Sequence, residues 1–421
     1  MLLTVMIVFF ILLLIGAPIW VALGAGGLIG AIYLGSPLTT IPSYFFNASD
    51  SWILLAVPYF LLAGNLMTYM GPAKKMLGFV NNLVGHLPGG MPAAAVITAA
   101  IFGALSGSST ATVIAVGSMV IPQMIALGYS KENSMGVVAA AGTLGQMIPP
   151  SIFMILYASI VQIDVSQLFL AGIVPGIFIA LILVVTSIIV CLRDDATRKK
   201  RSSFAEIKSS FLQALPSLIM PVIVLGGIYA GIFTPTEAAA VAVLYVLTIS
   251  YFFNREDCTM ENLKQSLKSS MITTAVIYII LGGATLFATS ITFAQVPQNI
   301  TEFITSLSVP NWTIMLLIVL ILLIFGLFLD SVPILYITVP ILYPTVVALG
   351  YDPIHFGIII VACLMIGQVT PPVGVSLFAI SGHFRESVVV VTKGIVPYLY
   401  ALLIATAVLI YVPWFSTFLF K

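Results

Sequence analysis

Charged side chains are scarce in this 421-residue sequence, where Asp, Glu, Lys and Arg together make up 7% of the residues. Soluble domains carry roughly a quarter charged residues, so this composition excludes an ordinary water-soluble globular protein. The formal net charge is only +1, which gives no reason to expect nucleic acid as a partner. Hydrophobic residues make up 61% of the chain, and many apolar runs exceed the ~20 residues that cross a bilayer. The sequence predicts a polytopic integral membrane protein.

Signatures of enzyme chemistry are also missing. The three cysteines, Cys191, Cys258 and Cys363, are scattered, without the spacing of a metal site or a disulfide pair. The three histidines are isolated and form neither an HExxH motif nor a triad spacing. There is no Walker A glycine-lysine motif, which excludes nucleotide-driven pumping by this chain itself. We therefore assign no catalytic residue and expect no enzymatic activity.

Two segments that echo each other stand out from the apolar background. Residues 145–151 read GQMIPPS and residues 367–374 read GQVTPPVG, so the second motif begins 222 residues after the first. Pro-Pro removes two amide donors and blocks the helix before it, so both apolar segments are predicted to break inside the membrane. Paired interrupted segments in two halves of a chain point to the binding site of a secondary transporter.

The other segments recur at nearly the same offset, which divides the chain into repeat 1 (1–192), a linking segment (193–233) and repeat 2 (234–421). In repeat 1 we expect scaffold helices over 3–70, the first of them one long span over 3–34, then an arm over 72–87, a hairpin over 92–127, a broken helix over 134–159 and a helix over 168–192. In repeat 2 we expect scaffold helices over 235–293, with a charged segment over 255–268 before a span over 271–293, then an arm over 297–308, a hairpin over 313–349, a broken helix over 356–381 and a helix over 395–420. The predicted fold is all-α.

Two kinds of element are predicted not to cross the bilayer. In the arm over 72–87, apolar residues at helical spacing alternate with Lys74, Lys75, Asn81 and Asn82, which suits a helix at the membrane interface. In the first hairpin, the polar run over 106–110 leaves roughly a dozen apolar residues on each side, too few to span. A re-entrant hairpin is the better interpretation, because its irregular turn is then buried in protein.

The basic residues define the sides of the membrane. Residues 193–208 hold six of the fifteen Lys and Arg residues, which predicts a cytoplasmic location. Counting crossings from this segment places the other basic segments in the cytoplasm, and it places outside four loops that contain no Lys or Arg: 35–51, 160–167, 294–311 and 350–355. The single linking span inverts the second copy, which makes an inverted-topology repeat. The N-terminus is then cytoplasmic and the C-terminus is outside.

The turn of the first hairpin, residues 106–110, reads SGSST. One explanation for this run is close packing of small residues between helices. Four hydroxyls at a hairpin turn favour a binding site, because a helix N-terminus there presents free amides to an anion. We expect this turn to contact a substrate carboxylate or sodium.

The two broken helices are predicted to bind a cation, since unwound carbonyls and hydroxyls such as that of Thr370 are the hard oxygen ligands that Na⁺ prefers. Single proline kinks would carry no such meaning, but these two recur at equal offsets, each beside a hairpin. Gln146 and Gln368 either take part in the site or only satisfy freed backbone groups, and the sequence leaves both roles open.

Asp330 follows a long uncharged run and precedes Ser-Val-Pro, so it is predicted to lie within the depth of the membrane. A carboxylate there costs about 2.5 to 3.5 kcal/mol, which makes it a functional candidate. It also suits the N-cap of the outgoing hairpin helix, and both roles can hold. Glu237, in TPTEAAA, is predicted to cap its own helix instead.

Five motifs in order identify a family resemblance: GALSGSSTATVIAVGSMVIPQM, GTLGQMIPPS, GIFTPTEAAAVA, GLFLDSVP and GQVTPPVG. Along essentially the whole chain, the sequence resembles the large membrane subunit (M, or DctM-like) of tripartite ATP-independent periplasmic (TRAP) transporters. The resemblance implies an elevator-type ion-transporter fold, in which the hairpins and broken helices carry the substrate and the other helices form a scaffold. It also implies location in a bacterial inner membrane, with the outside loops and the C-terminus in the periplasm.

The resemblance implies sodium symport with Na⁺ as the co-transported ion. It also implies two partners, a small four-helix membrane subunit (Q, DctQ-like) on a separate chain and a soluble periplasmic binding protein (P subunit) that delivers an organic acid. Overall likeness leans toward the sialic acid branch, with C4-dicarboxylates next. The alternative is a stand-alone sodium/organic-anion symporter of a related fold, without a binding protein.

The family's site residues transfer to matching positions of this sequence. The resemblance places a first sodium site at Ser106, Ser109 and the backbone around Gly145, Met147 and Pro149. It places a second sodium site at Gly326, Gly367 and Thr370, with Asp330 nearby. The candidates for substrate contact are Ser108, Thr110, Asp330 and Ser331. The residues that would support the broken helices are Gln146, Pro150, Gln368, Pro371 and Pro372.

Overall fold

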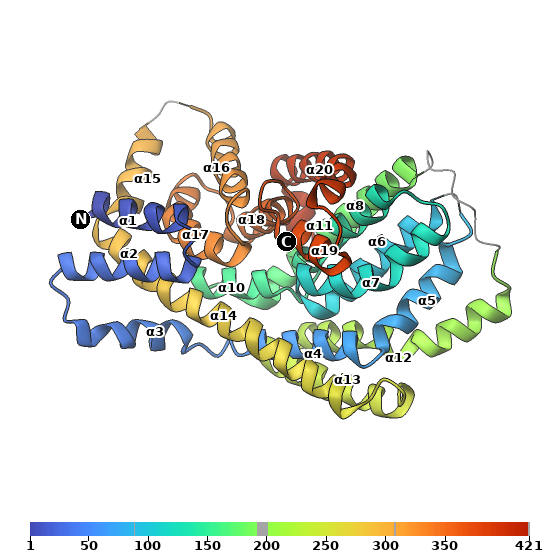
Figure 1. The fold of residues 1–421 in the computed structure, drawn as a ribbon. Coiled ribbons are helices and arrows are strands. Elements are labelled where there is room, and N and C mark those ends of the chain that lie inside the picture. Colours follow the sequence, from blue (N-terminus) through green and yellow to red (C-terminus); the bar gives the residue numbers. More distant parts are fainter. Residues whose placement is uncertain (88, 192–200, 307–308, 420–421) are drawn as a thin grey trace.

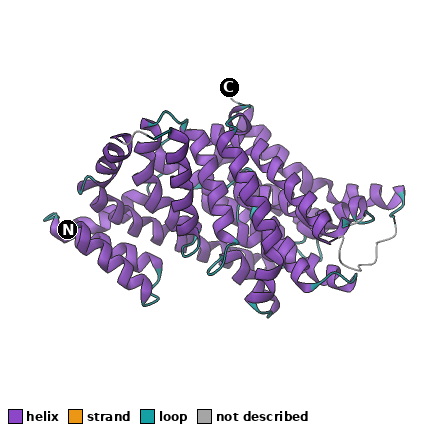
Figure 2. Ribbon diagram, turned by 90° about the horizontal axis from the view of Figure 1, so that it is seen from above, coloured by secondary structure: helices purple, strands orange, loops and turns teal. Residues whose placement is uncertain are grey.

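The computed structural model describes residues 1–421 except 88, 192–200, 307–308 and 420–421, which Figure 1 draws in grey. Within the described residues every regular element is a helix (Figure 2). Eight helical segments of this part of the chain are long and apolar enough to cross a membrane. The all-α prediction for a polytopic membrane protein is confirmed.

The first expected span is wrong, because the chain turns back within it. Helix α1 (Leu2–Leu14) ends before Gly16, whose φ of 79° suits glycine, and α2 (Ile19–Tyr33) starts after Pro18. The Thr4 and Tyr33 hydroxyls lie 3.5 Å apart, so the two helices run antiparallel. With 13 and 15 residues, each helix is shorter than a span. The crossing count that placed the N-terminus in the cytoplasm therefore loses its basis.

The longest helix, α14 (Met260–Phe293), crosses the molecule diagonally in Figure 1. It packs against α2, α3 (Ile41–Ser49) and α4 (Ala56–Tyr69). The sequence placed a charged segment before a span at 271, but the helix starts earlier because Thr259 caps it by accepting from the Asn262 amide. Helices α12 (Phe204–Tyr229) and α13 (Pro235–Phe253) lie on the same side of the molecule.

Both hairpins are present. The first consists of α6 (Gly90–Ser106) and α7 (Ser109–Ala126), and the second of α16 (Asn311–Gly326) and α17 (Ser331–Ala348). Their arms have 16 to 18 residues, which is more than the dozen expected, because the helices continue past the most apolar stretch. Gly107, with a φ of 59°, makes the first turn.

Both predicted breaks are present as well. In repeat 1, α8 (Lys131–Gly142) and the short α9 (Leu144–Met147) are separated from α10 (Ile152–Val161) by residues 148–151. In repeat 2, α18 (Pro353–Gln368) and α19 (Val375–Phe384) are separated by residues 369–374. The Pro-Pro peptide bond is cis in both breaks. Helix α18 is buried from Ile354 to Gln368. The first break is buried at Pro149 and Pro150, whereas Pro372 in the second break is exposed.

The remaining elements also match the predicted order. Each repeat has an amphipathic arm, α5 (Pro72–Val84) and α15 (Val296–Ser306), and ends with a long apolar helix, α11 (Val165–Cys191) and α20 (Val388–Tyr411). A short α21 (Trp414–Thr417) follows. Glu237 and Thr234 form a capping box at the start of α13, as predicted. Several predicted residues lie outside the described ones: 193–200 of the basic segment, 307–308 of the second arm, and the last residues, 192 and 420, of two predicted helices.

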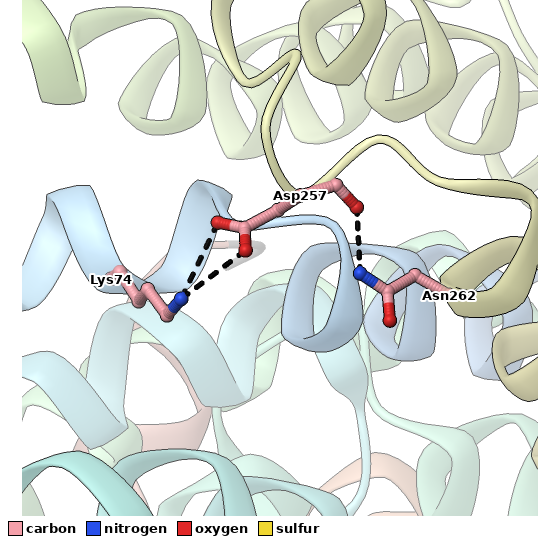
Figure 3. A network of polar contacts seen from close by, with 3 residues as sticks. All are labelled: Lys74, Asp257 and Asn262. Carbon is pink, nitrogen blue, oxygen red and sulfur yellow. Dashed lines mark hydrogen bonds and ion pairs between the residues drawn. The ribbon is translucent and has the colours of Figure 1, made fainter.

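Contacts between the loops agree with the predicted sides of the membrane. Lys74 Nζ lies 3.3 Å from Asp257 Oδ1 (Figure 3), and Lys131 pairs with Glu386, so segments predicted to be cytoplasmic meet one another. At the other end, the Thr236 hydroxyl donates to the Trp52 carbonyl at 2.8 Å. The chain is an inverted-topology repeat in which each copy contains a hairpin and a broken helix. The division into a moving part and a scaffold stays a prediction.

The crossing of α8 and α20 generates a stability prediction. A Cβ added to Gly394 would lie 1.8 Å from the Glu132 carbonyl oxygen, so Gly394→Ala is expected to destabilise the protein by about 1 to 3 kcal/mol. The measurement is thermal unfolding of the purified protein in detergent. Gly226→Ala is the matched control, because its new Cβ meets nothing within 4 Å. Equal losses in the two variants would contradict the tight crossing.

Candidate functional site

A cavity of about 360 Å³ lies between the helices α4 and α14 and the tips of the two hairpins. Asn65, Thr68 and Tyr69 line it from α4, and residues from Ser269 to Ile280 line it from α14. Its opposite wall contains five residues from the hairpin tips and the second break: Ser108, Ser109, Thr110, Asp330 and Gln368. Three of the four predicted substrate residues, Ser108, Thr110 and Asp330, therefore line one cavity. The fourth, Ser331, is buried beside it.

The first hairpin tip gathers oxygen atoms. Ser108 is the N-cap of α7, with its hydroxyl accepting from the Ala111 amide. The Ser106 and Thr112 hydroxyl oxygens lie 2.9 Å apart, and Thr112 donates to the Ser108 carbonyl at 2.7 Å. Ser106 and Thr112 are buried. Thr112 was missed by the sequence analysis, although it follows Ser108 by one helical turn.

Gly145 brings the first broken helix against this oxygen cluster. A Cβ on Gly145 would lie 3.0 Å from both the Ser108 carbonyl oxygen and Thr112 Oγ1. On its other side, a Cβ on Gly103 of α6 would lie 2.7 Å from the Gly145 Cα. The structure therefore brings together Ser106 and Gly145 of the first predicted sodium site.

The backbone carbonyls that follow Gly145 in the first break face two different neighbours, α11 and the hairpin turn. The Met147 carbonyl faces α11, where a Cβ on Gly172 would be 2.9 Å from its oxygen. The carbonyl of Pro150, one residue beyond Pro149, faces the hairpin turn, since a Cβ on Gly107 would be 3.0 Å from it. Within the break, Pro150 therefore presents its carbonyl to the hairpin turn.

Ser109 contacts the other repeat. Its hydroxyl oxygen lies 3.1 Å from that of Ser376, at the start of α19, and the Ser376 hydroxyl donates to Gln368 Oε1 at 3.1 Å. Gln368 Nε2 donates to Asp330 Oδ1 at 2.9 Å and to the Ser331 hydroxyl at 3.0 Å. Ser376 was also missed, because its position after the second break has no polar counterpart in repeat 1.

The two glutamines bind hairpin side chains. Gln146 Nε2 lies 3.5 Å from Ser331 Oγ, the same hydroxyl that accepts from Gln368. The two broken helices thus converge on the second hairpin tip. The Gln368 amide donates to the Asp330 and Ser331 side chains and accepts from Ser376. A role of either glutamine in the site stays a prediction.

The second predicted sodium site repeats the glycine crossing of the first. A Cβ on Gly326 would lie 2.8 Å from the Gly367 Cα, and the reverse substitution gives the same distance. Thr370 donates to the Ile366 carbonyl at 2.6 Å, which leaves the lone pairs of its oxygen for other partners. In the break around Pro371 and Pro372, the Val373 amide donates to the Leu327 carbonyl at 3.3 Å.

Asp330 is the N-cap of α17, as predicted, and its functional role stays a prediction. It caps α17 by accepting from the Ser331 amide at 2.7 Å, and it lines the cavity. Among the described residues that line the cavity, it is the one that carries a charge. The described residues contain no group of three or more His, Cys, Asp or Glu that could hold a metal ion. Besides the Asp330 carboxylate, the ligands that the hairpin tips offer are hydroxyl and carbonyl oxygens.

Comparisons with known proteins agree with this geometry. The sequence model of the family described as "Tripartite ATP-independent periplasmic transporter, DctM component" matches residues 6–415. Over 391 residues the chain is 41% identical to the C4-dicarboxylate TRAP transporter large permease protein DctM of Pseudomonas aeruginosa, covering 92% of this chain and 91% of that protein. Over 373 residues it is 33% identical to the sialic acid TRAP transporter large permease protein SiaM of Vibrio cholerae, covering 88% and 86%.

The fold also matches a solved structure. The crystal structure of the YdaH transporter from Alcanivorax borkumensis superimposes with a TM-score of 0.60 over 89% of this chain and 87% of that one, at 16% identity. Fold and site together define an inverted-repeat membrane transporter. The chain belongs to the DctM family, the large permease subunits of TRAP transporters, as the motifs predicted.

The amide of Gln368 generates a second stability prediction. Gln368→Leu leaves the buried Ser376 hydroxyl without its acceptor and removes a donor from Asp330, which is expected to cost about 1 to 3 kcal/mol. Gln146→Leu is the matched control, because Gln146 has one long side-chain contact and its buried Oε1 has no partner. Thermal unfolding in detergent should show a clearly larger loss for Gln368→Leu. A larger loss for Gln146→Leu would contradict the hydrogen-bond network around Gln368.

Proposed function

We propose that this chain is the transport subunit of a sodium-coupled symporter that imports a small organic acid. The observation that supports the proposal most directly is the first hairpin tip. There the buried hydroxyls of Ser106 and Thr112 and the half-buried Ser108 adjoin a cavity lined by the start of α7. One tip then serves two ligands, a cation on its buried side and an anion on its cavity side.

The anion is proposed to bind at the start of α7. The first amides of a helix have no partner within the helix and carry a partial positive charge, which favours a carboxylate. Ser109 and Thr110 provide these amides at the cavity wall, and the Ser108 and Thr110 side chains add hydroxyl donors. Ser331, at the second hairpin tip, accepts a hydrogen bond from Gln368 and so supports that part of the cavity wall.

Sodium is proposed to bind at two related places. The first comprises the hydroxyls of Ser106, Ser109 and Thr112, the Ser108 carbonyl and the backbone at Gly145. The second comprises Gly326, Gly367 and Thr370 beside Asp330. Both supply neutral hard oxygens, the ligands that suit an alkali cation. A cation near Asp330 would offset its negative charge, which otherwise opposes the binding of an anionic substrate.

A C4-dicarboxylate is the first choice of substrate and sialic acid the second. The sequence alone leaned toward sialic acid, but identity is 41% to the relative named for C4-dicarboxylates and 33% to the relative named for sialic acid. Two carboxylates would also suit a site that has helix N-termini at both hairpin tips, since α7 and α17 both begin at the cavity.

The family description implies two further components of a tripartite system. We propose a small four-helix membrane subunit and a periplasmic binding protein as partners, in a bacterial inner membrane. We propose that the basic segments lie in the cytoplasm and the C-terminus in the periplasm. Because α1 and α2 form a hairpin, we propose a periplasmic N-terminus in place of the cytoplasmic one that the crossing count predicted. Transport by an elevator mechanism would move the hairpins and broken helices past α4 and α14, which form the other wall of the cavity.

Uptake into proteoliposomes tests this function. With the small subunit and binding protein present, radiolabelled succinate is expected to accumulate only under an inward sodium gradient, and sialic acid at most slowly. Asp330→Asn is expected to lower the uptake rate at least about tenfold, because a membrane-depth carboxylate is lost. Succinate uptake by this chain alone would instead establish the stand-alone symporter. Succinate uptake at the same rate with and without a sodium gradient would overturn the proposal.

Thr112 gives a sharper test of the first sodium site. Thr112→Val keeps the side-chain shape but removes one ligand, and is expected to raise the sodium concentration for half-maximal uptake about tenfold. Thr98→Val is the matched control, since Thr98 is equally buried in the same hairpin and its hydroxyl has no partner. The control should leave the sodium dependence unchanged. A wild-type sodium dependence in Thr112→Val would exclude this residue as a ligand.

A further inference from the structure

A continuous chain of side-chain hydrogen bonds joins the two hairpin tips. It runs from Ser109 to Ser376, then to Gln368 and finally to Asp330, with distances of 3.1, 3.1 and 2.9 Å, and we call these four residues the relay. It passes from the first hairpin through the second broken helix to the second hairpin. Ser109, Ser376 and Gln368 are each 5% exposed or less, so water has little access to these side chains.

The direction of every bond in the relay follows from the orientation of the Gln368 amide. Its nitrogen can only donate and faces Asp330, whereas its carbonyl oxygen can only accept and faces Ser376. The hydroxyl hydrogen of Ser376 is then used for Gln368. The contact between the two serines must therefore be donated by Ser109. The oxygen of Ser109 keeps its lone pairs free to bind a cation.

This direction has a consequence for ion binding. A cation on the Ser109 oxygen polarises its O–H bond and makes it a stronger donor. Bonds in a buried chain strengthen one another, so the effect passes through Ser376 and Gln368 to Asp330. Gln368 and Asp330 line the cavity, where a firmer hydrogen bond holds both side chains in one orientation.

We propose that Ser376 is a positioning residue that couples sodium binding at the first hairpin to substrate binding in the cavity. This inference rests on the proposed sodium-coupled function and adds a residue to it. Ser376 is absent from the lining of the cavity and acts only through Ser109 and Gln368. Sodium binding and substrate binding must then favour each other reciprocally.

Equilibrium binding of radiolabelled succinate, measured with the purified membrane complex in lipid nanodiscs with sodium or with choline, tests the proposal. In the wild type, sodium is expected to tighten succinate binding at least about fivefold, the lower end of usual coupling. Ser376→Ala should keep the sodium-free affinity and lose most of this enhancement. A merely structural role would weaken binding in both salts. Ser376→Thr, which keeps the hydroxyl, should restore the coupling.

The matched control is Ser381→Ala on the same helix, since Ser381 donates to the Glu386 carbonyl and lies outside the relay. In Ser381→Ala, sodium should tighten succinate binding as much as it does in the wild type. Full coupling in Ser376→Ala, or loss of coupling in both Ser376→Ala and Ser376→Thr, overturns the relay and leaves sodium symport intact. A wild type that binds succinate equally in both salts overturns sodium coupling and the relay together.

Discussion

Every backbone amide and carbonyl at membrane depth needs a hydrogen-bond partner, and each broken helix leaves several such groups without a helical partner. Neighbouring side chains and backbone groups provide the missing partners. Ser151 donates to the Gln146 carbonyl and caps α10, while the second break donates the Val373 amide to the Leu327 carbonyl of the neighbouring hairpin. A break in this protein is thus stable only with its local caps and a hairpin against it. That dependence explains why hairpin and break occur together in both repeats.

Glycine makes the required approach possible. Gly103 meets Gly145 in repeat 1 and Gly326 meets Gly367 in repeat 2, at distances that leave no room for a Cβ. The same crossing therefore holds each hairpin against its own broken helix. Small residues allow such approach in a bilayer, where the hydrophobic effect does little to drive helices together. The oxygen cluster at the first tip exists because Gly145 permits it.

The site itself belongs to both repeats. Hairpin tips from the two copies line one cavity, and the side chains of Gln368 and Ser376 connect them. Because the copies are inverted, helices from both sides of the membrane end at this level, which brings two helix N-termini to the cavity. The opposite wall, formed by α4 and α14, contributes no charge among the described lining residues. Charge is therefore confined to the hairpin side, at Asp330.

The sequence by itself determined the hairpins and the breaks, because each is a polar or proline interruption in an apolar run. It determined the inverted repeat through the constant offset between the two copies and the distribution of basic residues. It failed where hydropathy is uniform, as at Gly16 and Pro18, which split a run long enough to span. The family resemblance named Ser108, Thr110 and Asp330 as candidates for substrate contact, and all three line one cavity, but the contact itself stays a prediction. The tertiary structure alone decided that Ser109 meets Ser376, 267 residues away, and that Gln368 orders the contact between them and Asp330. Such pairings depend on how the two copies pack, and no local pattern encodes that packing.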